Sequence, residues 1–189
     1  MAFMTIQQLQ KMGFKSLGNN VYISNRASIY GAERISIGNN VRIDDFSVLS
    51  SGEGGIIIGS YVHIAINASL IGAGKITVSD YANISSRVAI YSSNDDYSGN
   101  SMTNPMLPVE YTSVAKEDVT ICRHVILGCG SVILPGVTLN EGCAVGSLSL
   151  INKDCEPFSI YAGVPAKKIK NRSKKILELE ASFISNLKQ

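Results

Sequence analysis

The feature that most constrains the fold is a six-residue repeat between Ile121 and Glu156. An aliphatic residue returns at every sixth position, and a small or β-branched residue follows it four places later. The aliphatic set is Ile121, Leu127, Ile133, Leu139, Val145 and Ile151, and the second set is Val125, Ser131, Val137, Cys143, Ser149 and Cys155. This period matches neither a helix nor a single strand, and glycines recur between the apolar residues. Such a hexad predicts a parallel β-helix.

The same template occurs earlier in the chain in groups of three hexads, and each group predicts one triangular coil of three short strands. The groups are Leu17, Ile23 and Ile29; Ile37, Ile43 and Leu49; Ile58, Ile64 and Leu70; and Val78, Ile84 and Ile90. The steps from Ile37 to Ile58 and from Ile58 to Val78 are longer than three hexads and contain the glycine-rich segments 52–55 and 72–74. We expect bulged corners at these segments.

The hexads predict a single all-β domain over residues 1–189. We expect an N-terminal cap over 1–16, a β-helix over 17–156 that is interrupted by a long polar loop over 91–118, and a C-terminal tail and helix over 157–189. The cap should contain a short helix from Met4 to Met12 with Thr5 as a cap residue. The last helix should run from about Ser173 to Leu187, with an apolar stripe that docks on a coil face or on a neighbouring subunit.

The composition narrows the classes of function. The 189 residues are 45% hydrophobic with a formal net charge of +2, so nothing indicates a nucleic-acid surface. Neither a leader-like N-terminus nor a stretch of membrane-spanning length is present, and we expect a cytoplasmic protein. The four cysteines have no CxxC spacing, which predicts no metal site. Cys143 and Cys155 occupy interior positions of the hexad and should be buried free thiols.

Three segments carry a family resemblance. The segments 37–41 (IGNNV), 58–62 (IGSYV) and 161–169 (YAGVPAKKI) resemble the hexapeptide-repeat acyltransferases, and the likeness covers almost the whole chain. The resemblance implies left-handed coils, although parallel crossovers in general favour the right hand. It also implies a homotrimer that binds acetyl-coenzyme A in the groove between adjacent β-helices, with the acceptor sugar beside the loop.

A coenzyme A site needs a smooth surface for the pantetheine arm and cations for the 3′-phosphate. The corners at Gly128, Gly146 and Ser147 can supply the first. By the family pattern, Lys167 and Lys170 supply the second. Arg172 is a further candidate for the phosphate by its charge. The alternative is that these cations bind no phosphate and only keep the end of the chain solvated.

The loop predicts the chemistry. Family members that acylate a sugar hydroxyl place a histidine where this chain has Asp95, and the chain has only two histidines, His63 and His124. A hydroxyl is so weak an acid that a base must remove its proton during the reaction, and imidazole suits this task at neutral pH. An amine with a pKa near 8 is partly neutral at cellular pH and needs only a carboxylate to orient it and take the surplus proton. The sequence therefore favours N-acylation.

Site roles follow from this hypothesis. Asp95 is the predicted base, Ser85 positions the amine, and Glu117 is a weaker candidate for either role. Asn94 and Tyr97 are predicted to contact the substrate. The run 83–87 (NISSR) followed by 94–99 (NDDYSG) is similar to the nucleotide-sugar N-acyltransferases of the viosamine and anthrose pathways. This likeness implies a nucleotide-linked amino sugar as acceptor, first of all dTDP-4-amino-4,6-dideoxy-D-glucose, in O-antigen or related surface-polysaccharide synthesis.

Two other hypotheses stay open at this point. One is a sugar O-acetyltransferase of the galactoside, maltose or lipopolysaccharide type, with His63 or His124 as its base. The other is a non-catalytic β-helix scaffold, which the segment 161–169 argues against. An assay with amino sugars and their hydroxyl counterparts would separate the three hypotheses.

Overall fold

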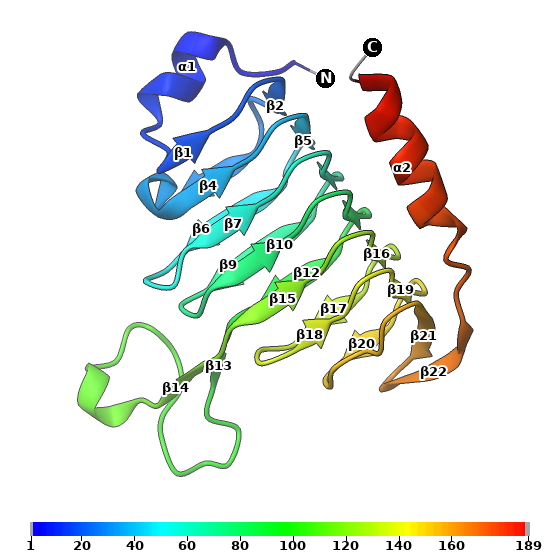
Figure 1. Cartoon of the computed structure of the whole chain (residues 1–189). Helices are drawn as coiled ribbons and strands as arrows, with labels where there is room; N and C mark the ends of the chain where they lie inside the picture. Colours follow the sequence, from blue (N-terminus) through cyan, green and yellow to red (C-terminus); the bar gives the residue numbers. More distant parts are fainter. Residues whose placement is uncertain (1, 188–189) are drawn as a thin grey trace.

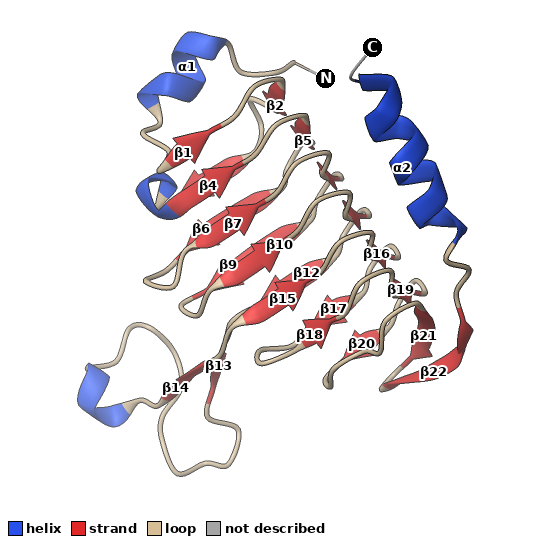
Figure 2. Ribbon diagram, in the orientation of Figure 1, coloured by secondary structure: helices blue, strands red, loops and turns tan. Residues whose placement is uncertain are grey.

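The chain winds into a parallel β-helix with three faces in the computed structural model, which describes residues 2–187 (Figures 1 and 2). The first face contains, in order, β1 (Ser16–Leu17), β4 (Ile35–Ile37), β7 (Ile56–Ile58), β10 (Ile76–Val78), β15 (Val119–Ile121) and β18 (Thr138–Leu139). The second contains β2 (Val21–Ile23), β5 (Val41–Ile43), β8 (His63–Ile64), β11 (Asn83–Ile84), β16 (Ile126–Leu127), β19 (Ala144–Val145), β21 (Ser159–Gly163) and β22 (Ala166–Asn171). The third contains β3 (Ser28–Tyr30), β6 (Val48–Ser51), β9 (Ser69–Gly72), β12 (Ala89–Tyr91), β17 (Val132–Ile133) and β20 (Leu150–Ile151).

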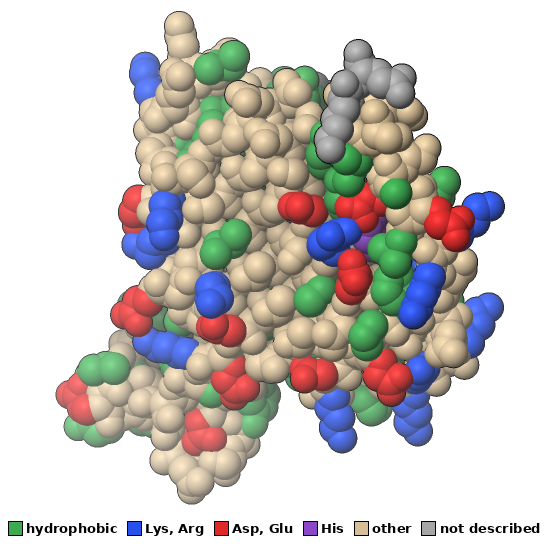
Figure 3. All heavy atoms as spheres, in the orientation of Figure 1, with side chains coloured by type: hydrophobic (Ala, Val, Ile, Leu, Met, Phe, Trp, Pro, Cys, Tyr) green, Lys and Arg blue, Asp and Glu red, His purple; other side chains and the backbone are tan. Residues whose placement is uncertain are grey.

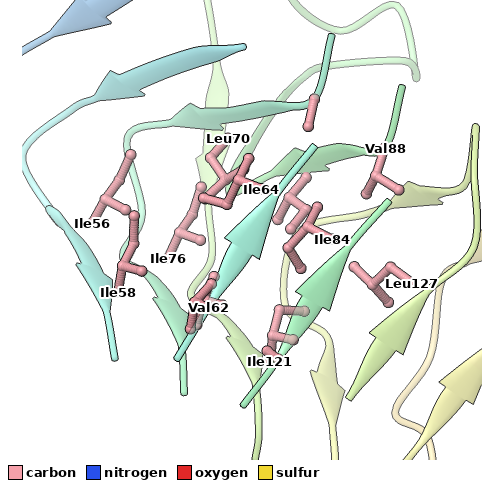
Figure 4. Close-up of a cluster of buried hydrophobic side chains, with 14 of the residues drawn as sticks. Ile56, Ile58, Val62, Ile64, Leu70, Ile76, Ile84, Val88, Ile121 and Leu127 are labelled. Carbon is pink, nitrogen blue, oxygen red and sulfur yellow. The ribbon is translucent and has the colours of Figure 1, made fainter. Parts of the chain in front are cut away.

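The strand register confirms the hexad prediction. Ile84 pairs with Ile64 on one side and with Leu127 on the other, so equivalent positions of successive coils stack directly. From the second coil onward these aliphatic side chains, and the small residues four places later, are at most 4% exposed. Figure 4 shows one such cluster pointing into the interior, with Ile64, Ile84 and Leu127 from neighbouring coils side by side. Burial of this ladder along the axis is the main source of stability.

The corners use a repeated backbone conformation. The third residue after a core aliphatic residue has a positive φ, which side chains other than glycine rarely adopt. At the corner between the first and second faces these residues are Asn20, Asn40, Tyr61, Tyr81 and His124, with φ between 55° and 61°. The Tyr81 ring stacks on Tyr61 at 5.3 Å and on His124 at 5.0 Å between centroids. Stacking between successive coils offsets part of the conformational cost.

The N-terminal helix is shorter than predicted. α1 (Ile6–Lys11) begins after Thr5, whose hydroxyl accepts from Gln8 N at 3.2 Å, while Thr5 N donates to Gln8 Oε1 at 2.7 Å. This capping box confirms Thr5 as the cap residue. Met4 lies outside the helix because its N–H donates to Ile23 O at 2.8 Å instead. Leu9 is buried and closes the apolar end of the first coil.

The C-terminal segment differs from the prediction at its start. β21 and β22 form an antiparallel pair that extends the second face, where only a tail motif was expected. α2 (Lys175–Leu187) begins two residues later than predicted, because Lys175 N donates to Ser173 Oγ at 3.2 Å and Ser173 therefore lies before the helix. The helix packs on the aromatic corner: the Phe183 ring lies 5.2 Å from that of Tyr61. Of the two docking sites expected for this helix, the structure shows a coil corner of the same chain.

The loop over 91–118 projects from the β-helix between β12 and β15 (Figure 1). It is more ordered than the sequence indicated, with an antiparallel pair of β13 (Ser93–Asp95) and β14 (Val114–Lys116) and a short 3-10 turn η2 (Val109–Tyr111). A similar turn, η1 (Ala32–Arg34), precedes β4. Two ion pairs join the base of the loop to the coils: Lys116 Nζ to Glu53 at 3.1 Å and Lys75 Nζ to Asp118 at 3.3 Å. The polar excursion therefore contains its own hairpin and is joined to the coils at its base.

Residues 2–187 also show which membrane and metal features the fold lacks. None of the helices there is both long and apolar enough to cross a membrane. That part of the chain also contains no group of three or more His, Cys, Asp or Glu side chains placed to hold a metal ion. Cys143 and Cys155 are buried free thiols as predicted, whereas Cys129 is exposed at a corner. A hydrogen bond with Cys155 and burial both raise the pKa of Cys143.

Candidate active site

A cleft of about 450 Å³ lies where the loop leaves the β-helix. It is lined by Tyr91, Ser93, Asn94, Asp95, Tyr97, Val114, Val132, Leu134 and Pro135. Asp95 is the last residue of β13 and lies opposite Val114 in β14, so the hairpin fixes its backbone. The structure thus brings together the three predicted loop residues Asn94, Asp95 and Tyr97, and all three are solvent-exposed.

The neighbouring carboxylate, Asp96, has a structural role. It accepts hydrogen bonds from Ser98 N and Ser101 N, both at 2.8 Å. Hydrogen bonds from Ser98 first, and from the backbone of Ser101 and Asn100, lower the pKa of Asp96. Asp96 therefore shapes the turn that carries Tyr97. Sequence reasoning missed this role, although an aspartate two residues before a serine is a signal for such a turn.

Glu117 lies at the edge of the same corner. Its backbone N donates to Ser92 O at 3.1 Å, and a β-carbon on Gly136 would overlap its Oε2. Because Gly136 follows the cleft residue Pro135, the Glu117 carboxylate lies beside the cleft but is not among its lining groups. Glu117 and Asp95 therefore lie near the same corner of the β-helix, but only Asp95 lines the cleft.

Ser85 occupies a different corner of the triangle. It follows β11, between the second and third faces, whereas the loop follows β12 at the far end of the third face. Ser85 N donates to Leu127 O, which places Ser85 beside Gly128 in the next coil. One chain therefore keeps Ser85 and Asp95 apart by the width of a face.

Small residues continue below Ser85 along the axis. Gly128 N donates to Val145 O and Gly146 N to Tyr161 O, both at 2.8 Å, which stacks Ser85, Gly128, Gly146 and Ala162 in one column. A β-carbon on Gly128 would lie 2.5 Å from Ser147 N, so close coil stacking requires glycine there. The four residues of the column are all partly exposed, so the column reaches the molecular surface. Ser147 is exposed at its corner.

The two predicted phosphate-binding lysines lie at the end of this column. Lys167 is opposite Ala162 and Lys170 is opposite Ile160, with a register shift between Ile160 and Tyr161. Residues three apart on a regular strand face opposite sides, but the irregularity places both lysines on the outer face. Lys168 lies opposite Tyr161 instead, and its Nζ pairs with Glu156 Oε2 at 2.7 Å. Figure 3 shows Lys and Arg side chains gathered over β22 and the start of α2.

Arg172 and His124 are engaged in holding the C-terminal segment. Arg172 Nη1 donates to three backbone carbonyls, those of His124 at 2.8 Å, Gly142 at 3.0 Å and Cys143 at 3.4 Å. The buried His124 ring contacts Glu180 Oε2 at 2.7 Å, and Arg123 binds the same oxygen. Burial raises the pKa of Glu180, but the hydrogen bonds and charges of His124 and Arg123 outweigh it and lower that pKa. Arg172 is therefore a structural clamp.

His63 lies on the outer surface of the second face. Its Nε2 contacts Asp44 Oδ2 at 2.9 Å, and Arg42 Nε donates to Asp44 Oδ1 at 2.7 Å. Burial raises the pKa of Asp44, but the hydrogen bonds from Arg42 and His63 outweigh it and hold the pKa below its usual value. Neither histidine approaches the loop cleft, because neither is among its lining residues.

Comparison with known proteins defines the class. No family model matches the chain. The dTDP-4-amino-4,6-dideoxy-D-glucose acyltransferase of Escherichia coli is 61% identical over 97% of this chain and 95% of its own. AntD, an N-acyltransferase from Bacillus cereus solved with dTDP and 3-hydroxybutyryl-CoA, is 46% identical, with a TM-score of 0.95 over 100% of both chains. A relative from Escherichia coli strain K12, WbbJ, is 29% identical over 79% of this chain and 74% of its own, and its name links it to O-acetyl transfer in lipopolysaccharide biosynthesis.

These likenesses establish an enzyme that transfers acyl groups. The chain belongs to the hexapeptide-repeat acyltransferases, and within them to the group of the dTDP-4-amino-4,6-dideoxy-D-glucose acyltransferases. The fold expectation of a left-handed β-helix is confirmed by the match to AntD over the full length. The identities also favour the N-acyltransferase hypothesis over the O-acetyltransferase and scaffold alternatives.

Proposed function

We propose that the protein transfers an acetyl group from acetyl-coenzyme A to the 4-amino group of dTDP-4-amino-4,6-dideoxy-D-glucose. The observation that carries this proposal is the near full-length identity of 61% to the acyltransferase named for that sugar. AntD supports it, because a variant of AntD was solved with the same dTDP-amino sugar and coenzyme A, with a TM-score of 0.94.

The donor lies along the column of small residues on the second face. Lys167 and Lys170 bind the 3′-phosphate, and the pantetheine arm passes Ala162, Gly146 and Gly128 toward Ser85. Backbone amides and carbonyls at the corners, including Ser147, bond the amides of the arm. This path brings the thioester to the Ser85 hydroxyl, which helps to position the reacting groups.

The acceptor occupies the loop cleft. Asn94 and Tyr97 contact the nucleotide sugar, and Asp95 binds its amine. The neutral amine attacks the thioester carbon, Asp95 takes the surplus proton from nitrogen, and the thiolate of coenzyme A leaves when the tetrahedral intermediate collapses. The AntD variants support these roles, since the aspartate and the serine replaced in them are ten residues apart, as Asp95 and Ser85 are here.

The active site is formed between subunits of a homotrimer. Ser85 and the loop cleft lie at two different corners of one chain, so neither half of the site is complete alone. A three-fold rotation can bring the loop corner of one copy against the small-residue column of the next, and three such contacts close a ring. Exposed apolar residues on the loop, such as Met106 (89%) and Val109 (82%), support this contact.

The product is an N-acylated nucleotide sugar, which remains an activated donor for a glycosyltransferase. The relation to WbbJ supports a place in surface-polysaccharide synthesis. We place the reaction in the cytoplasm, where acyl-coenzyme A and nucleotide sugars are made.

The test is an assay of free thiol release with acetyl-coenzyme A and a panel of acceptors. The expected result is rapid release with dTDP-4-amino-4,6-dideoxy-D-glucose and none with the 4-hydroxy sugar, dTDP-6-deoxy-D-glucose. Release with the hydroxyl sugar alone would overturn the amine assignment, and release with neither would overturn the substrate assignment.

A further inference from the structure

The column of small residues does not end at Ser85. Ala65 N donates to Ile84 O and Asp44 N donates to Ile64 O, both at 2.9 Å, so Ala65 and Asp44 are the next two positions of the column. Neighbouring strands lie about 4.8 Å apart, which puts Asp44 roughly 10 Å beyond Ser85 along the axis. The path that the donor follows on the surface therefore continues past the thioester.

The surface changes character at this end of the column. Asp44 is 6% exposed, and its two oxygens bind Arg42 and His63. His63 pairs with Asn83, which belongs to the same coil as Ser85, so His63 lies one coil beyond Ser85. The bond from its Nε2 to Asp44, which lies one coil beyond Ala65, turns the imidazole toward the column between the levels of Ala65 and Asp44. The His63 side chain remains 42% exposed, so a bound molecule can touch the ring.

An acyl group that extends past Ser85 meets this ring. One coil step of about 4.8 Å holds a carbonyl carbon and a methyl group, whereas a longer chain reaches the imidazole and the buried Asp44 carboxylate. Contact of added methylenes with Asp44 and its partners would require their hydrogen bonds to break or the ring to move.

We propose that His63, held by Asp44, is the wall that ends the acyl site and restricts the donor to short acyl groups such as acetyl. This inference rests on the proposed function, because it uses the same path of the coenzyme. His63 is a specificity-determining residue here and takes no proton from the amine. One or two methylenes in a fitted pocket change binding by a factor of about 10 to 200, which sets the size of the expected effect.

The experiment measures donor binding without any acceptor. Isothermal titration with acetyl-, butyryl- and 3-hydroxybutyryl-CoA is compared for the wild type, H63A and Y22A. Tyr22 is a matched control, because it is exposed on the same outer face, two strands from His63. We expect the wild type and Y22A to bind acetyl-CoA at least about 10-fold tighter than the two longer donors, and H63A to lose most of that preference.

A second variant covers the case in which H63A does not fold. D44N keeps the imidazole but weakens the bond that holds it, so the preference should fall between those of the wild type and H63A. An unchanged preference in H63A, or in D44N if H63A does not fold, would overturn the inference. So would a wild type that binds butyryl-CoA as tightly as acetyl-CoA. Because titration needs no sugar, a failure to acylate the dTDP-amino sugar would overturn the proposed acceptor and leave this result standing.

Discussion

Two adjacent carboxylates show how the backbone assigns roles to single residues. Asp96 accepts two backbone hydrogen bonds and its oxygens serve the turn. Asp95 lies at the end of β13 in the cleft, where a substrate can reach its carboxylate. Asp95 is the last residue of the strand and lines the cleft, whereas Asp96 begins the turn and bonds to its backbone, so the end of the strand separates an exposed carboxylate from a structural one.

At this scale we predict that Asp95→Asn lowers turnover about 10²- to 10⁴-fold at neutral pH, because the amide cannot accept the proton. Binding of acetyl-coenzyme A should stay nearly unchanged, since in the proposed site Asp95 binds the acceptor amine and not the coenzyme. The defect should shrink between pH 7 and 9, as more of the amine becomes neutral without help. Steady-state rates over this range test the idea, and a variant that keeps most of its turnover at pH 7 would remove Asp95 from the mechanism.

At the scale of elements, β22 and α2 together form the end of the molecule where we propose that the coenzyme phosphate binds. The irregular pairing of β22 places Lys167 and Lys170 on one face. Arg172 then ties the following segment to three carbonyls of the last coils, and α2 packs back over the aromatic corner. The position of the lysines therefore depends on contacts that begin well beyond them in sequence.

The first prediction for these elements concerns the lysines. Lys167→Ala and Lys170→Ala should each raise the KM for acetyl-coenzyme A by about 10- to 100-fold, which corresponds to the loss of a hydrogen bond to a charged group. Turnover should change little, because the phosphate is remote from the reacting carbon. Lys168→Ala is the control, since Lys168 pairs with Glu156. Equal use of dephospho-coenzyme A donors by the wild type and the variants would contradict the phosphate assignment.

The second prediction concerns the attachment of α2. The folded-state pKa of Glu180 lies below its usual value of 4.5, so its stabilising effect is complete above about pH 4.5 and is lost as the pH falls through the lower value. Glu180→Gln should lower the free energy of opening of α2 by about 1–3 kcal/mol at pH 7. The amides of α2 should therefore exchange hydrogen faster than in the wild type. The difference between variant and wild type should shrink as the pH falls below 4.5 and should vanish once the pH lies below the lowered pKa of Glu180. A difference that persists unchanged at acid pH would show that charge on Glu180 is not what holds the helix.

At the scale of the whole molecule, the three corners have three uses. One carries the aromatic stack and α2, one carries Ser85 and the column of small residues, and one carries the loop with Asp95. In the proposed site the second and third of these corners meet across a subunit interface, and three-fold assembly would join them in a closed ring. Light scattering at micromolar concentration should therefore return a trimer, and a monomer would contradict the shared site.

A mixing experiment tests the shared site more directly. Asp95→Asn and Ser85→Ala should each be nearly inactive alone. If subunits are mixed at random, one interface in about four combines an intact Asp95 with an intact Ser85, so co-refolded mixtures should regain about a quarter of wild-type activity. Mixtures that stay inactive, although mixed trimers form, would show that both residues act within one chain.

The sequence by itself determined the coil. Its hexads fixed which residues point inward, because each aliphatic residue that fell out of step would be exposed on a corner or would leave a void in the stack. The sequence also predicted the loop, because a long polar segment interrupts the hexads. It predicted the close approach of successive coils, because glycine occurs where there is no room for a side chain. Only the tertiary structure decided the rest. Ser85 and Asp95 are ten residues apart in sequence but lie on different corners, Arg172 and His124 are clamps, and Asp44 reaches His63 across coils. These outcomes depend on which residues of different coils become neighbours, and that is set by the winding of the whole chain.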